Sequence, residues 1–308
     1  MAAQSEFRVV TPTTITDAML VSSTLPETDY AAWSGATTYA SGDYVINTTT
    51  HRIYQSLADV NLNKDPTDSA NAAWWAETAP TNRWAMFDTQ SDSTSTAATS
   101  IVVELEPGRI DTLALLNVTA ATVQIEISTT EDGTYFDQTY TLIGDGDGVA
   151  DWYDYFYADI SYRSRLVIPN IPPIGGSIVT VTLTSTGGTV TLGSLIVGMS
   201  DVFGVAHMGA RASITDYSRK STDDFGRTTL VQRAYANRMS ITLSVERSRV
   251  DAVIRKLAAL RATLALWLAG TAVNSYESLQ IYGWFKDFDT TIDGPYYSSL
   301  ALEIEGIA

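Results

Sequence analysis

The pattern of hydrophobic and polar positions is dominated by short segments in which apolar and polar residues alternate. Six such segments, rich in β-branched residues, follow one another between residues 101 and 199, and Gly, Pro, Asn or Asp separates them: IVVELEP, IDTLALLNV, TVQIEIST, SRLVIPNI, SIVTVTLTST and TVTLGSLIVGM. Short strands that recur at a spacing of roughly 8–12 residues are typical of a β-sandwich or jelly roll. We therefore predict a β-sandwich domain over residues 89–200, entered through a polar linker without periodicity at residues 89–100.

The pattern changes near residue 201, and one segment there has helical periodicity. In SRVDAVIRKLAALRATLA, five apolar residues form a stripe at helical spacing: Val250, Val253, Ile254, Leu257 and Leu260. Ser248 is the expected N-cap, with Asp251 three residues later in the capping-box position. Strand-like segments lie on both sides of this helix. Residues 201–308 are therefore predicted to form an α+β domain, a small antiparallel sheet that carries one helix.

The first 88 residues divide into two parts. Residues 1–28 form an N-terminal extended segment whose short strands are broken at Pro12 and Pro26. Because proline cannot donate a backbone hydrogen bond, these strands are expected at a sheet edge and not in its centre. Residues 29–88 are rich in aromatic side chains and are predicted to form a separate small β module. The fold class expected for the whole chain is mainly β.

Composition indicates a folded chain, and the charge restricts its partners. Of the 308 residues, 45% are hydrophobic and 18% charged, and Cys is absent, which excludes disulfides and thiolate metal sites. The formal charge of −16 lies entirely in the first 200 residues, because the remainder holds 12 basic and 12 acidic residues. Such a field repels phosphate backbones, so nucleic acid is not an expected partner. The longest apolar run, residues 262–273, is too short to span a bilayer, and no signal peptide is expected.

The sequence offers little for catalysis. It lacks a G-x-S-x-G nucleophile elbow, a P-loop and a G-x-G-x-x-G that opens a helix. The two histidines, His51 and His207, lie in ordinary local contexts and are expected to be structural or exposed. Glycosidase chemistry by paired carboxylates stays open, because their separation in space does not show in a sequence. We expect a protein that is not an enzyme and needs no cofactor.

One acidic stretch, DGDGVADWYD at residues 145–154, is the candidate for a metal site. Asp145, Asp147 and Asp151 offer hard oxygen ligands around a glycine-rich turn, as Ca²⁺ requires. The stretch resembles the aspartate-rich loops of thrombospondin-type and dockerin-type calcium repeats. It departs from EF-hand spacing and lacks the closing Glu, so an acidic hairpin loop without metal is the alternative.

The aromatic module carries an ordered set of residues: Trp33, Tyr39, Ser41, Gly42, Asp43, Val45, Tyr54, Gln55, Ser56, Asn61, Pro66, Trp74 and Trp75. This order resembles small carbohydrate-binding modules of the chitin-binding type over residues 32–75. A module of this size needs large rings in its core, and Trp33, Tyr54 and Trp75 are the expected core aromatics. Rings left outside would stack on sugars, and Tyr44, Trp74 and Tyr39 are the candidates. The alternative is a structural decoration that binds no sugar.

Longer stretches suggest a setting for this module. GRIDTLALLNVTAATVQIEI resembles galactose-binding-type jelly rolls. DYSRKSTDDFGRTTLVQRAYANRMSITLSV, the helix and LQIYGWFKDFDTTIDGPYYSSLALEIEGI are similar to tail-tip proteins of long-tailed bacteriophages, of the distal-tail or baseplate-hub kind. This resemblance implies a structural virion protein, made in the bacterial cytoplasm, that forms a ring of six copies. The ring would join the tail tube to hub and fibre proteins, and the module would face host surface polysaccharide.

A charged loop at residues 218–227 is the candidate for contacts between copies. It carries both signs of charge, which suits polar contacts across an interface, at Arg219, Lys220, Asp223, Asp224 and Arg227. The alternative is a solvated hairpin tip.

Two other functions remain open. The first is a free-standing or secreted glycan-binding protein, or an accessory part of a polysaccharide-degrading enzyme. The second is a polysaccharide depolymerase, which would require an acidic pair in a cleft.

Overall fold

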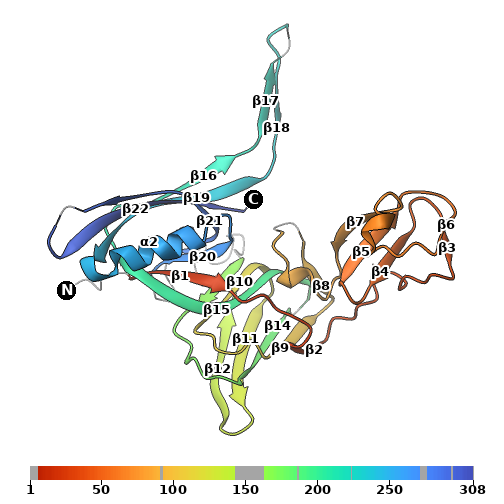
Figure 1. Cartoon of the computed structure of the whole chain (residues 1–308), viewed down its shortest axis with the longest axis horizontal. Helices are drawn as coiled ribbons and strands as arrows, with labels where there is room; N and C mark the ends of the chain where they lie inside the picture. The colour runs from red at the N-terminus through yellow and green to blue at the C-terminus, as the bar shows by residue number, and fades with distance from the viewer. Residues whose placement is uncertain are drawn as a thin grey trace, which may run out of the picture.

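The computed structural model describes residues 6–90, 93–142, 163–185, 187–222, 224–270, 276–292 and 294–307. The chain is mainly β, as predicted from the alternating segments, and its sheets are antiparallel (Figure 1). One α-helix, α2 (Val250–Ala259), occurs within the described residues. No helix in the described ranges has the length and apolar character needed to cross a membrane.

Six strands pair in a closed cycle and form a barrel. In order around the cycle they are β1 (Glu6–Pro12), β20 (Ala265–Ala269), β21 (Gln280–Thr291), β22 (Tyr297–Gly306), β19 (Tyr235–Glu246) and β15 (Val190–Ala206). Two pairs close the cycle between β15 and β19, Val205 with Ser244 and Ala206 with Leu243. The barrel thus joins the beginning of the described chain to its end.

The barrel core is built around Trp267. Its indole is fully buried, lies against the rings of Phe7, Phe203 and Phe285 at centroid distances of 6.2, 6.4 and 6.2 Å, and donates from Nε1 to the Gly283 carbonyl at 2.9 Å. The apolar stripe of α2 packs into the same core through Val250, Val253, Leu257 and Leu260. Burial of this apolar stripe against the barrel core stabilises the helix, which the helical periodicity predicted.

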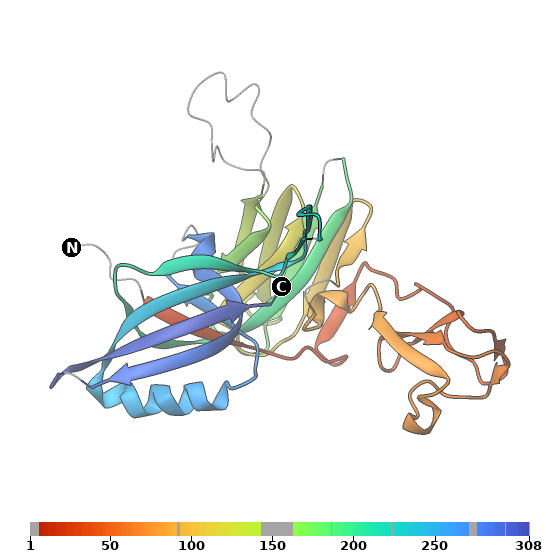
Figure 2. The same ribbon diagram turned by 90° about the horizontal axis from the view of Figure 1, so that it is seen from above.

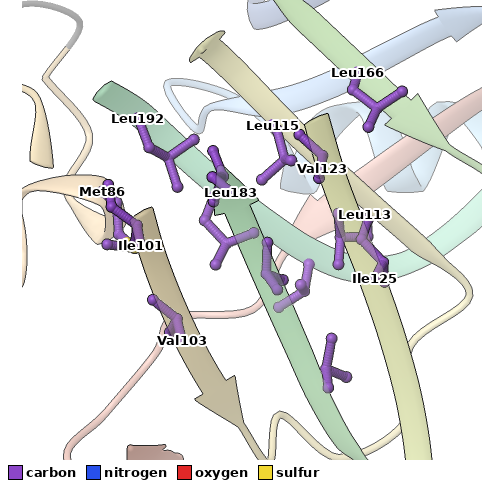
Figure 3. Packing of buried hydrophobic residues seen from close by; sticks show 14 of the residues in the cluster. Met86, Ile101, Val103, Leu113, Leu115, Val123, Ile125, Leu166, Leu183 and Leu192 are labelled. Carbon is purple, nitrogen blue, oxygen red and sulfur yellow. The ribbon is translucent and has the colours of Figure 1, made fainter. Parts of the chain in front are cut away.

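A second core lies between the first half of β15 and a separate sheet. The sheet has the order β12 (Gly133–Thr141), β11 (Thr122–Thr129), β14 (Ile178–Thr184), β9 (Ser100–Leu105) and β2 (Leu20–Ser23). Opposite it, β15 pairs with β10 (Thr112–Thr119), which pairs with β13 (Arg165–Ile168). The alternating apolar residues of both layers point inward and meet, among them Leu113, Leu115, Val123, Ile125, Leu183 and Leu192 (Figure 3).

β15 belongs to both cores. Its 17 residues pair with β10 over the first half and with β1 over the second. The two units meet at Gly198, where an added Cβ would lie 2.3 Å from the Thr11 carbonyl oxygen. Glycine is therefore required at this crossing by the close approach of the backbones.

The expectation of edge strands near the prolines is wrong for β1. This strand lies between β15 and β20. Pro12 is tolerated because it is the last residue of β1, whereas β20 pairs only with residues Phe7 to Val10. For β2 the expectation holds, since β2 is the last strand of its sheet.

Two further local expectations are wrong. The polar linker at residues 89–100 contains β8 (Ser95–Ala97), which pairs with β15, and Ser95 Oγ donates to the Asn82 carbonyl at 2.6 Å. The capping box is not formed, because a 3₁₀ turn η3 (Arg247–Arg249) precedes α2. Ser248 Oγ donates to Glu246 Oε1 at 2.9 Å and not to the helix.

The aromatic module contains two small sheets of its own. These are β3 (Thr38–Tyr39) with β6 (Asn61–Leu62), and β4 (Tyr44–Asn47) with β5 (Arg52–Ser56) and β7 (Trp75–Pro80). Two short 3₁₀ turns, η1 (Ser69–Asn71) and η2 (Ala85–Phe87), complete the module. Another 3₁₀ turn, η4 (Glu277–Leu279), lies outside the module and precedes β21. The module stands to one side of the barrel (Figure 2).

A two-stranded ribbon projects away from the barrel (Figure 1). β16 (Arg211–Asp216) pairs with β19, and beyond it β17 (Arg219–Thr222) and β18 (Thr228–Val231) pair only with each other (Figure 1). We refer to β17, β18 and the described residues of their turn as the arm.

Candidate functional site

The core of the module is a cluster of rings, as the small size of the module predicted. Tyr39, Tyr54 and Trp75 are buried with Val45, and Trp33 and Trp74 are partly buried against them. The Tyr39 ring meets Trp75 edge-on at 5.3 Å, and Trp75 Nε1 donates to the Lys64 carbonyl at 2.8 Å.

Tyr39 is therefore not the sugar-stacking ring that the sequence suggested. Its side chain is 9% exposed, and its hydroxyl accepts from the Ser34 backbone N–H at 2.9 Å. A buried tyrosine needs such a partner, and here the loop before β3 provides it.

Tyr44 is exposed, and it is joined by a residue that the sequence pattern missed. Tyr30 and Tyr44 are 44% and 38% exposed and stack with their ring centroids 5.0 Å apart at an interplanar angle of 19°. Backbone bonds hold the strand-like segment beside β4, from Trp33 N to the Ile46 carbonyl and from Ile46 N to the Ala31 carbonyl. Tyr30 was missed because it lies just ahead of the residues that match the motif.

The Tyr30–Tyr44 pair forms an apolar plate with a polar neighbour. Gln55 of β5 lies directly opposite Tyr44 in the strand pairing. Stacked rings beside an amide can hold the apolar face of a sugar and bond to its hydroxyl groups. The third candidate, Trp74, is partly buried, and the Lys64 ammonium lies 5.5 Å from its ring centroid.

His51 is the centre of a network at the base of the module. Its Nδ1 lies 2.8 Å from Glu27 Oε1, and its Nε2 lies 2.6 Å from Asp17 Oδ1. Its ring stacks on Trp84 at a centroid distance of 4.1 Å. The imidazolium form satisfies both carboxylates because both of its nitrogens donate, whereas the neutral ring satisfies one.

The same network ties three separate segments together. Glu27 also accepts from Thr81 Oγ1 at 2.9 Å, and the Thr81 N–H donates to the His51 carbonyl at 2.9 Å. A cavity of about 360 Å³ lies beside it, bordered by Asp17, His51 and Trp84 among others. The sequence offered no signal for this network, because its members are distant along the chain. The arrangement fastens the module to the segment that carries Asp17 and Glu27.

The arm carries hydrophobic side chains that are exposed to solvent. Phe225 is 92% exposed and Leu230 is 74% exposed, and Val231 is exposed as well. The candidate contact residues Arg219, Lys220, Asp224 and Arg227 all lie on the arm or its turn, and Asp223 lies outside the described residues. The structure thus brings the charged candidates and an apolar surface together on one projecting element.

A second exposed surface lies at the far end of the β21–β22 hairpin. Ile292, Tyr296 and Tyr297 are exposed there, and the Tyr296 carbonyl accepts from the Arg247 N–H at 2.9 Å.

No metal centre is found where the structure can be described. The calcium candidates Asp145, Asp147 and Asp151 lie outside the described residues. Among the residues that the structure describes, no three His, Asp or Glu side chains are grouped so that they could hold a metal ion.

Comparisons with known proteins give no family. No family model matches the chain, and no curated protein matches it. The lectin domain of lectinolysin, solved with Lewis B antigen, is similar over 38% of this chain and 82% of its own, with 9% identity and a TM-score of 0.26. A fucose-binding module of Streptococcus pneumoniae is similar over 38% of this chain and 83% of its own, with 16% identity and a TM-score of 0.26. Both are carbohydrate-binding modules by name, but similarity at this level carries no conclusion about the present chain.

Proposed function

We propose that this chain is a structural subunit of a homo-oligomeric assembly, and that its aromatic module binds surface glycans. The observation that carries the proposal is the arm. A two-stranded ribbon alone is marginally stable in water, and this one also exposes Phe225 and Leu230. Unpaired strand edges and exposed apolar side chains favour pairing with another chain. An arm of this kind is explained when a neighbouring subunit covers it.

The finer form of the proposal is a ring at the tip of a bacteriophage tail. Its support is the sequence resemblance of the arm, the helix and the last two strands to tail-tip proteins. The electrically neutral last third, with 12 basic and 12 acidic residues, suits packing between copies, while the acidic remainder keeps the outside soluble.

Glycan binding rests on the exposed Tyr30–Tyr44 pair. A single pair of rings binds a sugar weakly, but several copies on one assembly add their contacts through avidity. Glycan binding by the module would therefore depend on the arm, because only an assembly presents many modules to one glycan surface.

The mass of the purified chain, measured by light scattering over a range of concentrations, tests assembly. We expect oligomers for the wild type and a shift toward monomer for Leu230→Asp, whereas Tyr276→Ala, at an exposed residue away from the arm, leaves the mass unchanged. A wild type that stays monomeric at every concentration contradicts the proposal.

Glycan-array binding of the double variant Tyr30→Ala/Tyr44→Ala tests the module. We expect loss of binding with unchanged oligomer mass, because neither residue contacts the arm. A monomeric wild type that binds glycans through Tyr30 and Tyr44 would instead support a free-standing glycan-binding protein, the second candidate, which the exposed ring pair favours.

A further inference from the structure

We propose that a pocket between the sandwich and the barrel binds a small carboxylate, with Arg165 as the residue that recognises the negative charge. The pocket has a volume of about 250 Å³ and is lined by residues of both units. Its lining includes no residue of the arm and neither Tyr30 nor Tyr44. The inference therefore does not depend on the proposed assembly or on glycan binding by the module.

The sandwich side of the pocket is a row of three side chains on neighbouring strands. Leu116 of β10 lies directly opposite Ser194 of β15 and directly opposite Arg165 of β13. Residues that lie directly opposite each other in a sheet have their side chains on the same face. Leu116 packs against a buried cluster that includes Val10 and Leu266 of the barrel, so this face is turned toward the barrel. The row therefore places a guanidinium and a hydroxyl group between the two units.

The barrel side of the pocket is formed by β19, β21 and the residues that follow them in the pairing. Tyr282 of β21 packs against the same buried cluster as Leu116, and its carbonyl accepts from the Ile307 N–H at 3.2 Å. Asn237 of β19 also lines this side. Burial and then the charge of Asp88 raise the pKa of Tyr282 above its ordinary value of 10.0. The Tyr282 hydroxyl therefore keeps its proton at neutral pH and is available as a donor.

The polar side chains around the pocket are available to a ligand. Ser194 is 7% exposed, and its hydroxyl forms no hydrogen bond with any described residue. Within the part of the chain that the structure describes, the same holds for five other side chains of the lining: Asn117, Ser164, Tyr235, Asn237 and Tyr282. A polar group that is shielded from water and lacks a partner costs free energy. A ligand that bonds to these groups would remove that cost.

The charge of the lining favours an anion. None of the described residues that line the pocket is acidic, although the chain has a formal charge of −16. Arg165 is partly buried, donates to the Gln280 carbonyl at 3.3 Å, and forms no ion pair within the described residues. A guanidinium presents five N–H donors in a planar fork that matches a carboxylate, which only accepts. A small carboxylate with neighbouring hydroxyl groups, such as an acidic sugar, therefore fits the pocket.

Saturation-transfer NMR with the full chain tests the inference on three probes. D-Glucuronate is the expected ligand, D-glucose is its uncharged match, and lactate is a carboxylate without a sugar ring. We expect glucuronate to bind with a Kd of about 1 mM or below, and glucose to bind at least about tenfold more weakly because it lacks the group that pairs with Arg165. Lactate that binds as tightly as glucuronate assigns the pocket to carboxylates in general. Weaker binding of lactate assigns it to acidic sugars.

Substitutions on the sandwich side of the pocket give a second test. Arg165→Gln is expected to weaken glucuronate binding by at least about tenfold, and Arg165→Lys, which keeps the charge but lacks the fork, by less. Arg163→Gln is the matched control, because Arg163 lies outside the lining and 4.0 Å from Glu277, and it should leave the Kd unchanged. Ser194→Val replaces the hydroxyl with a methyl group and leaves the contact of Arg165 with Gln280 in place. It is expected to weaken glucuronate binding by about tenfold as well.

Three outcomes overturn the inference. They are equal binding of glucose and glucuronate, unchanged glucuronate binding in Arg165→Gln or Ser194→Val, and no binding of either carboxylate at about twenty times the expected Kd. The comparison of probes uses the wild type alone, so it does not depend on the folding of a variant.

The same measurements separate the pocket from the proposed function. Tyr30→Ala/Tyr44→Ala should bind glucuronate like the wild type, and loss of binding in that variant would move the site to the module and overturn the inference. Arg165→Gln should keep the oligomer mass of the wild type and the glycan binding that depends on Tyr30 and Tyr44.

Discussion

Substitution of His51 by alanine tests whether its network fastens the module. The change removes the contacts of the ring with Asp17 at 2.6 Å and with Glu27 at 2.8 Å, and the stacking on Trp84 at 4.1 Å. Glu27 keeps only the Thr81 hydroxyl among the partners described. The barrel and the sandwich contain none of the deleted atoms, so the effect should remain local.

The magnitude follows from how exposed each contact is. The Glu27 side chain is 10% exposed, and a hydrogen bond to a charged group in such a place contributes about 2 kcal/mol. The Asp17 side chain is 67% exposed, so solvent reduces its contribution to about 0.5 kcal/mol. The ring stacking adds about 1 kcal/mol. The junction should therefore open more easily by about 3.5 kcal/mol, which corresponds to a rise of roughly 400-fold in the population of the open form.

Hydrogen exchange of the Thr81 amide measures this opening directly, because that N–H donates to the His51 carbonyl at 2.9 Å. We expect its exchange in His51→Ala to be faster by roughly 400-fold, with amides of β15 unchanged. His207→Ala, at the other histidine and in contact with Ser244 of the barrel, is the matched control. A Thr81 amide that exchanges at the wild-type rate in His51→Ala would show that the module is held by other contacts.

Three further predictions concern stability. Gly283→Ala should destabilise the barrel by about 1–3 kcal/mol or more, because the added Cβ would lie 2.1 Å from the Glu305 carbonyl oxygen. Urea unfolding measures this loss, and an unchanged midpoint would contradict the close packing. Leu115→Ala should cost about 3 kcal/mol in the same assay, because the side chain is fully buried in the sandwich; a loss below 1 kcal/mol would mean that the cavity collapses. Burial and then the charge of Asp88 raise the pKa of Tyr282 above its ordinary value of 10.0, so its contribution to stability is present below pH 10 and is lost as the pH rises through the raised pKa. Tyr282→Phe should therefore be less sensitive to alkaline unfolding than the wild type, and equal sensitivity would contradict this.

Much of the fold could be predicted from local patterns. The strands of the sandwich follow from alternation of β-branched residues, and α2 follows from one apolar stripe, because each pattern has a period that only one kind of element satisfies. The buried rings Tyr54 and Trp75 could be predicted because a small module has few other residues with which to fill a core.

The remaining features depend on contacts between distant segments. The central place of β1 is set by β15 and β20, which follow it by about two hundred residues or more. Tyr39 is buried against Trp75, and its hydroxyl accepts a hydrogen bond from the Ser34 N–H. The contacts of His51 come from Asp17, Glu27 and Trp84. The local pattern of hydrophobic and polar residues does not predict such tertiary contacts. The sequence around an aromatic residue or a histidine in a turn therefore does not show which side chains will contact it.

The shared strand β15 makes the sandwich and the barrel mechanically one body. Because its backbone passes from one core into the other without a hinge, a pull on the sandwich is transmitted along the strand to β1 and β19. The sandwich and the barrel cannot be separated as two fragments by cleavage within residues Val190–Ala206, because such a cleavage divides a strand that belongs to both. A pulling force applied to the sandwich would thus reach the barrel as shear across many backbone hydrogen bonds at once. Such an arrangement resists mechanical unfolding, because these bonds must break together.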